Sequence, residues 1–307
     1  MSELAQCILC GNVSPARPIA SLRDNPNGLS KVVACGHCGH RQISPLPSPE
    51  EEEAYYADDK KPRELFGDVD FLDIIKLKAR KDTERRLDWL RRTRTPSGSP
   101  RVLDVGAGYG FFVDLASKAG YNAWGMEPSV ARHEFSRDNM AGTFVNAAVD
   151  EAFVAQHRGQ WDVVTTFHVL EHLRDPVSYL SLLLALVAPG GHLIVEVPNA
   201  ADELIPQIPE YGAFHWVSVH LNYFDAARLD LALKKAGATD FSIEGIQRYG
   251  LRHLIRWTDM RAPDLHSADI TGGSPLLDAM EEQYRAYRQR ALTSDTIGAV
   301  IRVNRNS

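Results

Sequence analysis

Two carboxylates and a glycine-rich run are spaced in a way that suits the binding of a nucleotide-like cofactor. Asp104 stands two residues before the run at 106–110, which has the form G-x-G-x-G, and Glu127 ends the next apolar run. Glycines let backbone N–H groups approach a ligand closely, and a carboxylate can accept hydrogen bonds from ribose hydroxyls. Nicotinamide dehydrogenases use G-x-G-x-x-G, so this spacing disfavours an oxidoreductase.

Four cysteines form two close pairs in the pattern C-x2-C-x24-C-x2-C, and each pair is followed by a glycine. Four soft thiolates in this arrangement suit tetrahedral zinc. Two disulfides are the alternative, which the lack of a signal-peptide pattern disfavours. His37 and His40 are expected to face solvent because four thiols are already available. We therefore predict one structural Zn²⁺ on Cys7, Cys10, Cys35 and Cys38.

Histidines gather in two segments that could supply a general base, because the imidazole pKa lies near neutrality. The first segment, 168–172, has the sequence His-Val-Leu-Glu-His and directly follows an apolar run. The second segment, 215–224, contains His215 and His220. The first also matches the H-x-x-E-H motif of inverted zinc proteases, but its position after the glycine-rich run and Glu127 argues against a protease.

Alternating apolar runs and helical patterns predict an α/β fold around these residues. The runs at 102–105, 121–127, 143–145, 161–167 and 192–198 predict strands of a mainly parallel sheet covered on both faces. A helix is expected at 226–236 and another at 275–292. Residues 241–257 predict a sixth strand or hairpin region, and 296–303 predict the last strand.

Four segments in this order, 102–110, 125–129, 167–173 and 188–193, resemble class I S-adenosylmethionine-dependent methyltransferases. The resemblance covers roughly residues 100–240 and implies a Rossmann-like sheet that binds S-adenosylmethionine. It also implies which residues bind this cofactor. They are Asp104, Gly106, Ala107, Gly108, Glu127, Pro128, Ala148, Phe167 and His168.

The segment 220–224, His-Leu-Asn-Tyr-Phe, is similar to the E-H-x-x-Y-F segment of sugar C-methyltransferases, several of which share an N-terminal zinc module. This resemblance implies that His220 is the catalytic base, with His168 as the second candidate. Val219 stands where those enzymes have glutamate. The expected acceptor is a small polar metabolite such as a sugar, a nucleotide-sugar, or a surface-glycan or natural-product precursor. The sequence does not fix the acceptor or the atom that is methylated.

Two other functions compete with this one. The segment 168–172 is similar to the E-x-x-E-H motif of metal-assisted RNA 2′-O-methyltransferases, and this resemblance implies that His168, Glu171, His172 and a later histidine would hold a divalent metal. That family has glutamate where this chain has His168. The other alternative is a zinc-ribbon nucleic-acid-binding protein with a degenerate cofactor fold. A net charge of −6 and the intact Asp104 and Glu127 favour an enzyme and argue against a nucleic-acid partner.

The 307 residues divide into three expected parts: a zinc ribbon at 1–48, a helical linker or cap at 49–99, and a methyltransferase domain at 100–307 with a cap insertion near 258–293. One long helix or two joined ones are expected at 69–93, with Arg85 and Arg86 on a solvated basic face. The alternative for this face is a surface that recruits the phosphate of a nucleotide-linked substrate. The apolar stretch at 179–188 is too short to span a bilayer, and the expected location is cytoplasmic. The oligomeric state stays open.

Overall fold

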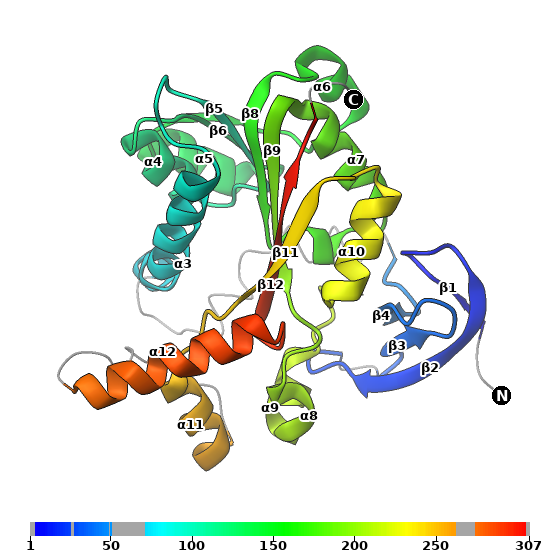
Figure 1. Ribbon diagram of the computed structural model, residues 1–307. Coiled ribbons are helices and arrows are strands. Elements are labelled where there is room, and N and C mark those ends of the chain that lie inside the picture. Colours follow the sequence, from blue (N-terminus) through cyan, green and yellow to red (C-terminus); the bar gives the residue numbers. More distant parts are fainter. Residues whose placement is uncertain (1–3, 26–27, 49, 51–70, 262–273, 305–307) are drawn as a thin grey trace.

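The computed structural model describes residues 4–25, 28–48, 50, 71–261 and 274–304 (Figure 1). Residues 51–70 of the predicted linker and 262–273 of the predicted insertion lie outside this range. Among the described residues, no helix has the length and apolar character that crossing a membrane requires.

A seven-stranded sheet forms the centre, in the order β7, β6, β5, β8, β9, β12, β11. The first five of these strands run parallel, and β12 pairs antiparallel with both β9 and β11. This arrangement confirms the predicted Rossmann-like sheet. The strands are β5 (Arg101–Val105), β6 (Asn122–Met126), β7 (Thr143–Val145), β8 (Trp161–Phe167), β9 (Val187–Pro198), β11 (Phe241–Ile246) and β12 (Thr296–Arg302).

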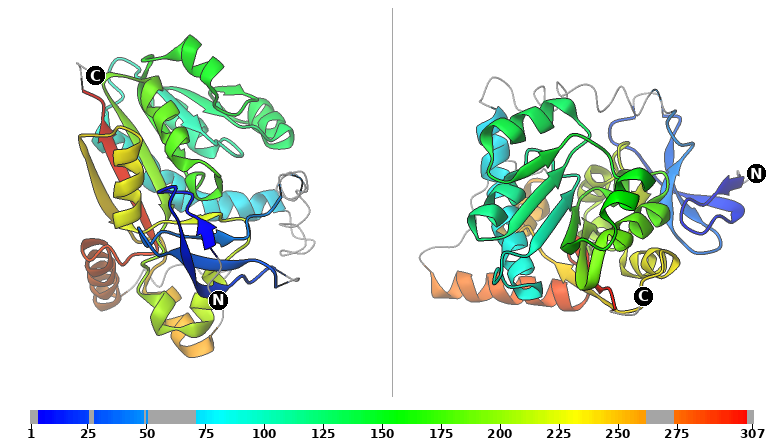
Figure 2. Two further views of the ribbon diagram at one scale, coloured as in Figure 1. Left: turned by 90° about the vertical axis from the view of Figure 1, so that its right-hand side faces the viewer. Right: turned by 90° about the horizontal axis from the view of Figure 1, so that it is seen from above.

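Helices cover both faces of this sheet (Figures 1 and 2). Val102 of β5 packs in the cluster that includes Leu90 of α3, whereas its neighbour Leu103 packs in the cluster that includes Leu180 of α7. Burial on both faces explains why the strand is apolar without alternation. One face carries α3 (Phe71–Thr93), α4 (Phe111–Lys118) and α5 (Val130–Asn139), and the other carries α6 (Glu151–His157), α7 (Pro176–Leu186) and α10 (Ala226–Lys235).

The N-terminal ribbon is a second sheet, in the order β1, β2, β3, β4, β10. Its last strand, β10, comes from the predicted methyltransferase domain, and there Asn222 lies opposite Gln42 and Tyr223 opposite Arg41. The two parts therefore share a sheet, and they also share an apolar cluster that joins Ile43 to Tyr223. The strands are β1 (Leu4–Gln6), β2 (Val13–Ser21), β3 (Lys31–Cys35), β4 (Arg41–Ser44) and β10 (Asn222–Tyr223).

The prediction of a strand or hairpin region at 241–257 is wrong beyond Ile246, because α11 (Leu251–Met260) is a helix. Its apolar residues Leu251, Leu254 and Trp257 recur every three positions, which suits one helix face. Trp257 is buried against Tyr211 of α9. The segment between β11 and β12 also contains α12 (Pro275–Arg290), close to the predicted helix, and the loop after β9 contains α8 (Leu204–Gln207) and α9 (Pro209–His215).

Candidate cofactor site, histidine centre and metal site

The glycine turn joins β5 to α4 and leaves part of its backbone open. Gly106 has a φ of 82°, and an added Cβ would lie 2.3 Å from Val169 Cγ2, so only glycine fits there. Its N–H and that of Ala107 donate to the Met126 carbonyl oxygen, at 2.8 and 3.0 Å. At Gly108 no described atom comes within 4 Å of an added Cβ. The backbone at Gly108 therefore borders space that a ligand could fill.

Glu127 follows β6 and is held in place by the backbone. Its Oε2 accepts a hydrogen bond from the Gly108 N–H at 2.8 Å, and its Oε1 accepts one from the Ser129 N–H at 3.0 Å. An ionised carboxylate has about four lone-pair sites, so each oxygen retains one for a further donor. The carboxylate is thus positioned beside the open turn with capacity for the two hydroxyls of a ribose.

Asp104 lies beneath the turn and is 4% exposed. The Thr165 hydroxyl donates to Asp104 Oδ1 at 2.7 Å and so links β5 to β8. Burial raises the pKa of Asp104 to about 6, against the lowering effect of this hydrogen bond. Asp104 therefore connects the ends of two central strands.

The other predicted cofactor residues differ in their surroundings. Pro128 and Ala148 are exposed, just beyond β6 and β7. Phe167 is 8% exposed, and its ring centroid lies 5.0 Å from that of Phe112 and 4.5 Å from the Arg86 guanidinium carbon. Phe167 thus belongs to the core beside α3 and α4.

His168 follows β8 in a left-handed conformation, with a φ of 57°, which is uncommon for a residue other than glycine. Its Nδ1 lies 3.3 Å from Glu171 Oε1, and its Nε2 lies 3.1 Å from Glu196 Oε1. Burial and the charge of Arg248 lower the pKa of His168, but the two carboxylates outweigh them and the pKa is raised. The imidazole therefore lies between two acids that favour its protonated form.

Glu171 and His220 lie next to this pair. Glu171 is 1% exposed in the short 3-10 helix η1 (Leu170–His172). Burial alone would raise the pKa of Glu171, but the hydrogen bond from His168 and the nearby histidine charges lower it to about 2. The His220 ring centroid is 5.0 Å from that of His172, and burial lowers the pKa of His220 to about 3. The structure thus brings both predicted histidine segments together at the end of β8.

Glu196 of β9 was missed by the sequence reasoning. It is 1% exposed and accepts hydrogen bonds from Arg85 Nη1 at 2.8 Å and Arg86 Nη2 at 2.7 Å. The prediction that these two arginines lie on a solvated helix face is therefore wrong. A carboxylate inside the apolar run at 193–197 was the available signal, because a buried acid needs a cationic partner.

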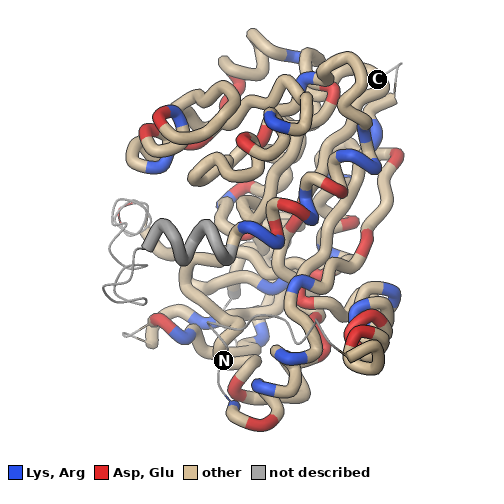
Figure 3. The backbone as a smooth tube through the Cα atoms, turned by 90° about the vertical axis from the view of Figure 1, so that its left-hand side faces the viewer, with Lys and Arg blue, Asp and Glu red and all other residues tan. Residues whose placement is uncertain are grey.

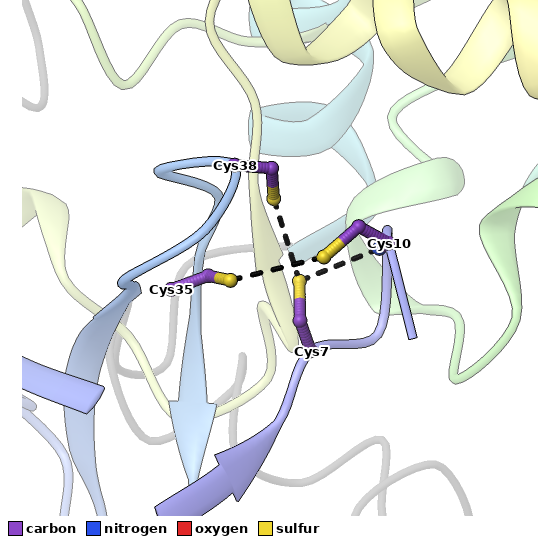
Figure 4. A group of neighbouring side chains, drawn as sticks. All are labelled: Cys7, Cys10, Cys35 and Cys38. Atoms are coloured by element: carbon purple, nitrogen blue, oxygen red, sulfur yellow. Dashed lines mark hydrogen bonds between the residues drawn. The ribbon is translucent and has the colours of Figure 1, made fainter. Parts of the chain in front are cut away.

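The four cysteines converge as predicted (Figure 4). Their sulfur atoms all lie within 4.8 Å of one another, with Cys7 Sγ 3.6 Å from Cys38 Sγ and Cys10 Sγ 3.8 Å from Cys35 Sγ. Tetrahedral zinc with Zn–S bonds of about 2.3 Å needs sulfur atoms about 3.8 Å apart, so the spacing fits this ion. Backbone N–H groups of Cys38 and His37 and the Ser14 hydroxyl outweigh the effect of burial and lower the pKa of Cys35 to about 6.

The expectation that His40 faces solvent is wrong, whereas His37 is exposed as expected. His40 is fully buried, and its Nε2 lies 2.9 Å from Asn222 Oδ1 in β10. Arg228 of α10 donates to the Cys38 carbonyl oxygen from Nε at 3.0 Å and from Nη2 at 2.8 Å. The cysteine site is therefore tied to the segment that carries His220.

Removing one cysteine tests the proposed zinc site. We expect Cys38→Ser to bind about one zinc ion per chain less than the wild type, because a closed structural site needs four ligands. Metal analysis of both purified proteins after gel filtration measures this difference. Equal zinc contents, or two disulfides in the wild type by mass spectrometry under non-reducing conditions, would contradict the site.

Comparison with known proteins agrees with this fold. Residues 74–243 match the family model described as Methyltransferase domain, which is more than half of the chain. Ubiquinone biosynthesis O-methyltransferases of Aromatoleum aromaticum and Ralstonia nicotianae are 35% and 36% identical over 119 and 114 residues. These matches cover 37% and 35% of this chain and 50% and 47% of the relatives, so the chain spans about half the length of the curated relatives it matches.

Two solved structures share the fold with a TM-score of 0.51 each. One is a SAM-dependent methyltransferase from Archaeoglobus fulgidus, with 18% identity over 76% of this chain and 100% of the other. The second is a possible histamine N-methyltransferase from Thermotoga maritima, with 15% identity over 80% of this chain and 99% of the other. By the family match and the sheet order together, the chain belongs to the class I family of S-adenosylmethionine-dependent methyltransferases.

Proposed function

We propose that this protein transfers the methyl group of S-adenosylmethionine to an oxygen atom of a small polar acceptor. The observation that carries the proposal is the grouping of the glycine turn, Glu127 and His168 at the carboxyl ends of the adjacent strands β5, β6 and β8. Ligands of such sheets bind at this edge. Methyl transfer from a sulfonium is an in-line displacement, so the protein mainly has to align the two reactants and exclude water.

The cofactor part of the proposal assigns each end of S-adenosylmethionine to one side of the turn. The glycine turn that follows Asp104, with Gly106 and the open backbone at Gly108, would receive the amino-acid part, and Glu127 would accept hydrogen bonds from the ribose. Ala107 belongs to the same turn, and Pro128 and Ala148 would flank the adenine. His168, at the end of β8, would lie near the transferred methyl group, and Phe167 precedes it in the chain.

Glu127→Ala tests this assignment. We expect it to weaken S-adenosylmethionine binding about tenfold or more, because hydrogen bonds to a charged carboxylate contribute about 1.5–3 kcal/mol. Isothermal titration calorimetry measures the change. Glu151→Ala, an exposed acid in the first turn of α6, is the control and should bind like the wild type. An unchanged affinity in Glu127→Ala would contradict the assignment.

The acceptor oxygen must lose a proton as the methyl group arrives. We propose that His220 is needed for this loss, because its ring lies beside that of His172 at the end of β8 and its buried Nδ1 has no hydrogen-bond partner among the described residues. His168 is the second candidate for the base. Its position between the Glu171 and Glu196 carboxylates favours the protonated imidazole, which is an ion-pair partner of these acids. The pairing of β10 with β4 supports a further role for the ribbon, which would hold the segment of His220 in position.

The class of acceptor rests on two resemblances that point in different directions. The curated relatives are named for O-methylation in ubiquinone biosynthesis, which supports an oxygen acceptor and lends no support to a sugar. The resemblance of segment 220–224 to sugar C-methyltransferases is the reason to test sugars and nucleotide-sugars as acceptors. Mass spectrometry of small molecules that co-purify with the protein, followed by S-adenosylhomocysteine release assays with sugars, nucleotide-sugars and hydroxylated aromatic compounds, separates these classes. Methylation of carbon alone would contradict the proposed oxygen acceptor.

The distribution of charge supports a small acceptor over a nucleic acid. The chain carries a net charge of −6. Acidic and basic residues are interspersed along the described backbone in Figure 3, instead of gathering by sign. Nucleic-acid binding relies on a basic patch or stripe. RNA 2′-O-methylation and simple nucleic-acid binding are therefore less well supported than transfer to a small metabolite.

A further inference from the structure

Three side chains beside the proposed methyl-transfer site present metal-ligating atoms to one point. One ligand atom each from Glu171, His172 and His220 lies within 4.8 Å of the other two. Glu171 and His172 belong to η1, which follows β8, and His220 lies two residues before β10. The two segments pack against each other. The cluster is thus formed by tertiary structure and not by one local motif.

Two buried atoms in this cluster have unmet bonding capacity. Among the described residues, Glu171 Oε2 and His220 Nδ1 have no hydrogen-bond partner although both atoms are buried. Glu171 as a whole is 1% exposed. A buried, incompletely paired carboxylate is costly unless a cation or donor satisfies it. The cluster therefore has the chemical character of a cation site.

The surrounding bonds orient the ligands in the way that metal sites require. His172 Nδ1 donates its hydrogen to the Val219 carbonyl oxygen at 2.9 Å, so Nε2 carries the lone pair. That Nε2 lies 3.9 Å from Glu171 Oε1, and the same oxygen lies 3.3 Å from His168 Nδ1. Ligating histidines usually donate their other N–H to a carbonyl, and ligating carboxylates are themselves hydrogen-bonded.

We infer that Glu171, His172 and His220 bind a divalent first-row transition-metal ion, separate from the zinc at the four cysteines. Two imidazoles and one carboxylate form a mixed nitrogen and oxygen set that suits zinc, manganese or iron and leaves coordination positions open. The second part of the inference, which rests on the proposed function, is that an open coordination position of the ion would take the acceptor hydroxyl. The bound hydroxyl would lose its proton more readily because the ion stabilises the negative charge on its oxygen.

This site changes what His220 contributes. A metal ion and a proton compete for the same imidazole lone pair, so a ligating His220 does not accept the proton at that moment. With the ion bound, the hydroxyl proton would leave to water. The His220 side chain is needed in either case, and measuring metal binding separates the two roles.

Manganese titration of the full-length protein tests the site without any acceptor. Mn²⁺ is suitable because it prefers oxygen and nitrogen ligands to the thiolates of the ribbon, and protein-bound Mn²⁺ loses the sharp spectrum of the free ion in electron paramagnetic resonance. We expect about one Mn²⁺ per chain with the ribbon zinc retained, as one three-residue site requires. Added Zn²⁺ should displace it, because zinc binds such ligands more tightly.

Three variants locate the ion. Glu171→Gln, which keeps the size of the side chain, and His220→Ala should each weaken Mn²⁺ binding about tenfold or more, since even outer-shell changes cost that much. His192→Ala is the matched control, because His192 is a half-buried histidine in the middle of β9 and outside the cluster. It should bind Mn²⁺ like the wild type. Thermal unfolding without added metal verifies that each variant is folded.

Two outcomes would overturn the inference. One is no binding of Mn²⁺ or of a second Zn²⁺ at millimolar concentration, and the other is binding that Glu171→Gln and His220→Ala leave unchanged. Calorimetry with S-adenosylmethionine on the same samples separates this failure from a failure of the proposed function. Cofactor binding without a second ion would contradict only the metal site, whereas loss of cofactor binding in the wild type would contradict the methyltransferase proposal itself.

Discussion

His220→Ala should lower the turnover of methyl transfer by about a hundredfold or more while S-adenosylmethionine affinity stays nearly unchanged. The side chain lies at the end of β8 beside Glu171 and His172, and it has a buried nitrogen that no described residue satisfies. Its removal takes away the group on which proton loss from the acceptor depends, whether directly or through a bound ion. Steady-state kinetics with the identified acceptor, with calorimetry for the cofactor, measure both quantities.

His215→Ala is the comparison for this effect. His215 belongs to the same segment and its ring packs 4.8 Å from that of Trp216, outside the cluster of Glu171 and His220. A much smaller loss of turnover is expected from it. If both variants lose activity equally, the segment matters through its structure, and if His220→Ala keeps near-normal turnover, the role passes to His168 or the reaction needs no base.

Glu196→Ala should have the largest effect on stability, with about 3–5 kcal/mol lost from the free energy of unfolding. The carboxylate is 1% exposed and lies among Arg85, Arg86 and His168, so its removal takes a shared acidic partner from three partly buried side chains. Urea unfolding measures the loss. Asp88→Ala on the same helix is the control, because the Asp88 and Arg91 side chains are 63% and 49% exposed, and such surface pairs contribute less than about 1 kcal/mol.

The contribution of Glu196 should also depend on pH in a defined direction. Burial raises the pKa of this carboxyl, but the charges of Arg86 and Arg85 and the bond from His168 outweigh it, and the pKa is lowered well below its ordinary value of 4.5. The stabilisation is therefore complete above about pH 4.5 and is lost as the pH falls below that value. Urea unfolding of the wild type and Glu196→Gln at pH 7 and pH 3.5 should show a smaller difference at the lower pH. A difference that grows on acidification would contradict this linkage.

Features encoded in short stretches of sequence were predictable. The strand β8 was predicted with its observed bounds, 161–167, because its apolar run is bounded by turn residues. The position of the glycine turn after β5 and that of Glu127 after β6 were predictable, because close backbone approach and the strand order restrict residue types locally. The four cysteines were predictable from spacing, since their sulfur atoms converge as a tetrahedral ion requires.

Features that depend on distant contacts were not predictable. The pairing of β10 with β4 joins Asn222 to Gln42, and it buries His40, which the sequence analysis expected at the surface. The contact of Arg85 with Glu196 likewise joins residues 111 positions apart. Helix α11 was mistaken for strand or hairpin because a short apolar run fits both periods, and only the burial of Trp257 against Tyr211 decides between them.

Calorimetric titration of the wild-type protein with S-adenosylmethionine, and in parallel with NADH, tests the central claim most directly. The glycine turn with G-x-G-x-G spacing and the Glu127 carboxylate predict binding of S-adenosylmethionine at about micromolar concentration, or about −8 kcal/mol, and no comparable binding of NADH. Tight binding of NADH with none of S-adenosylmethionine would contradict it.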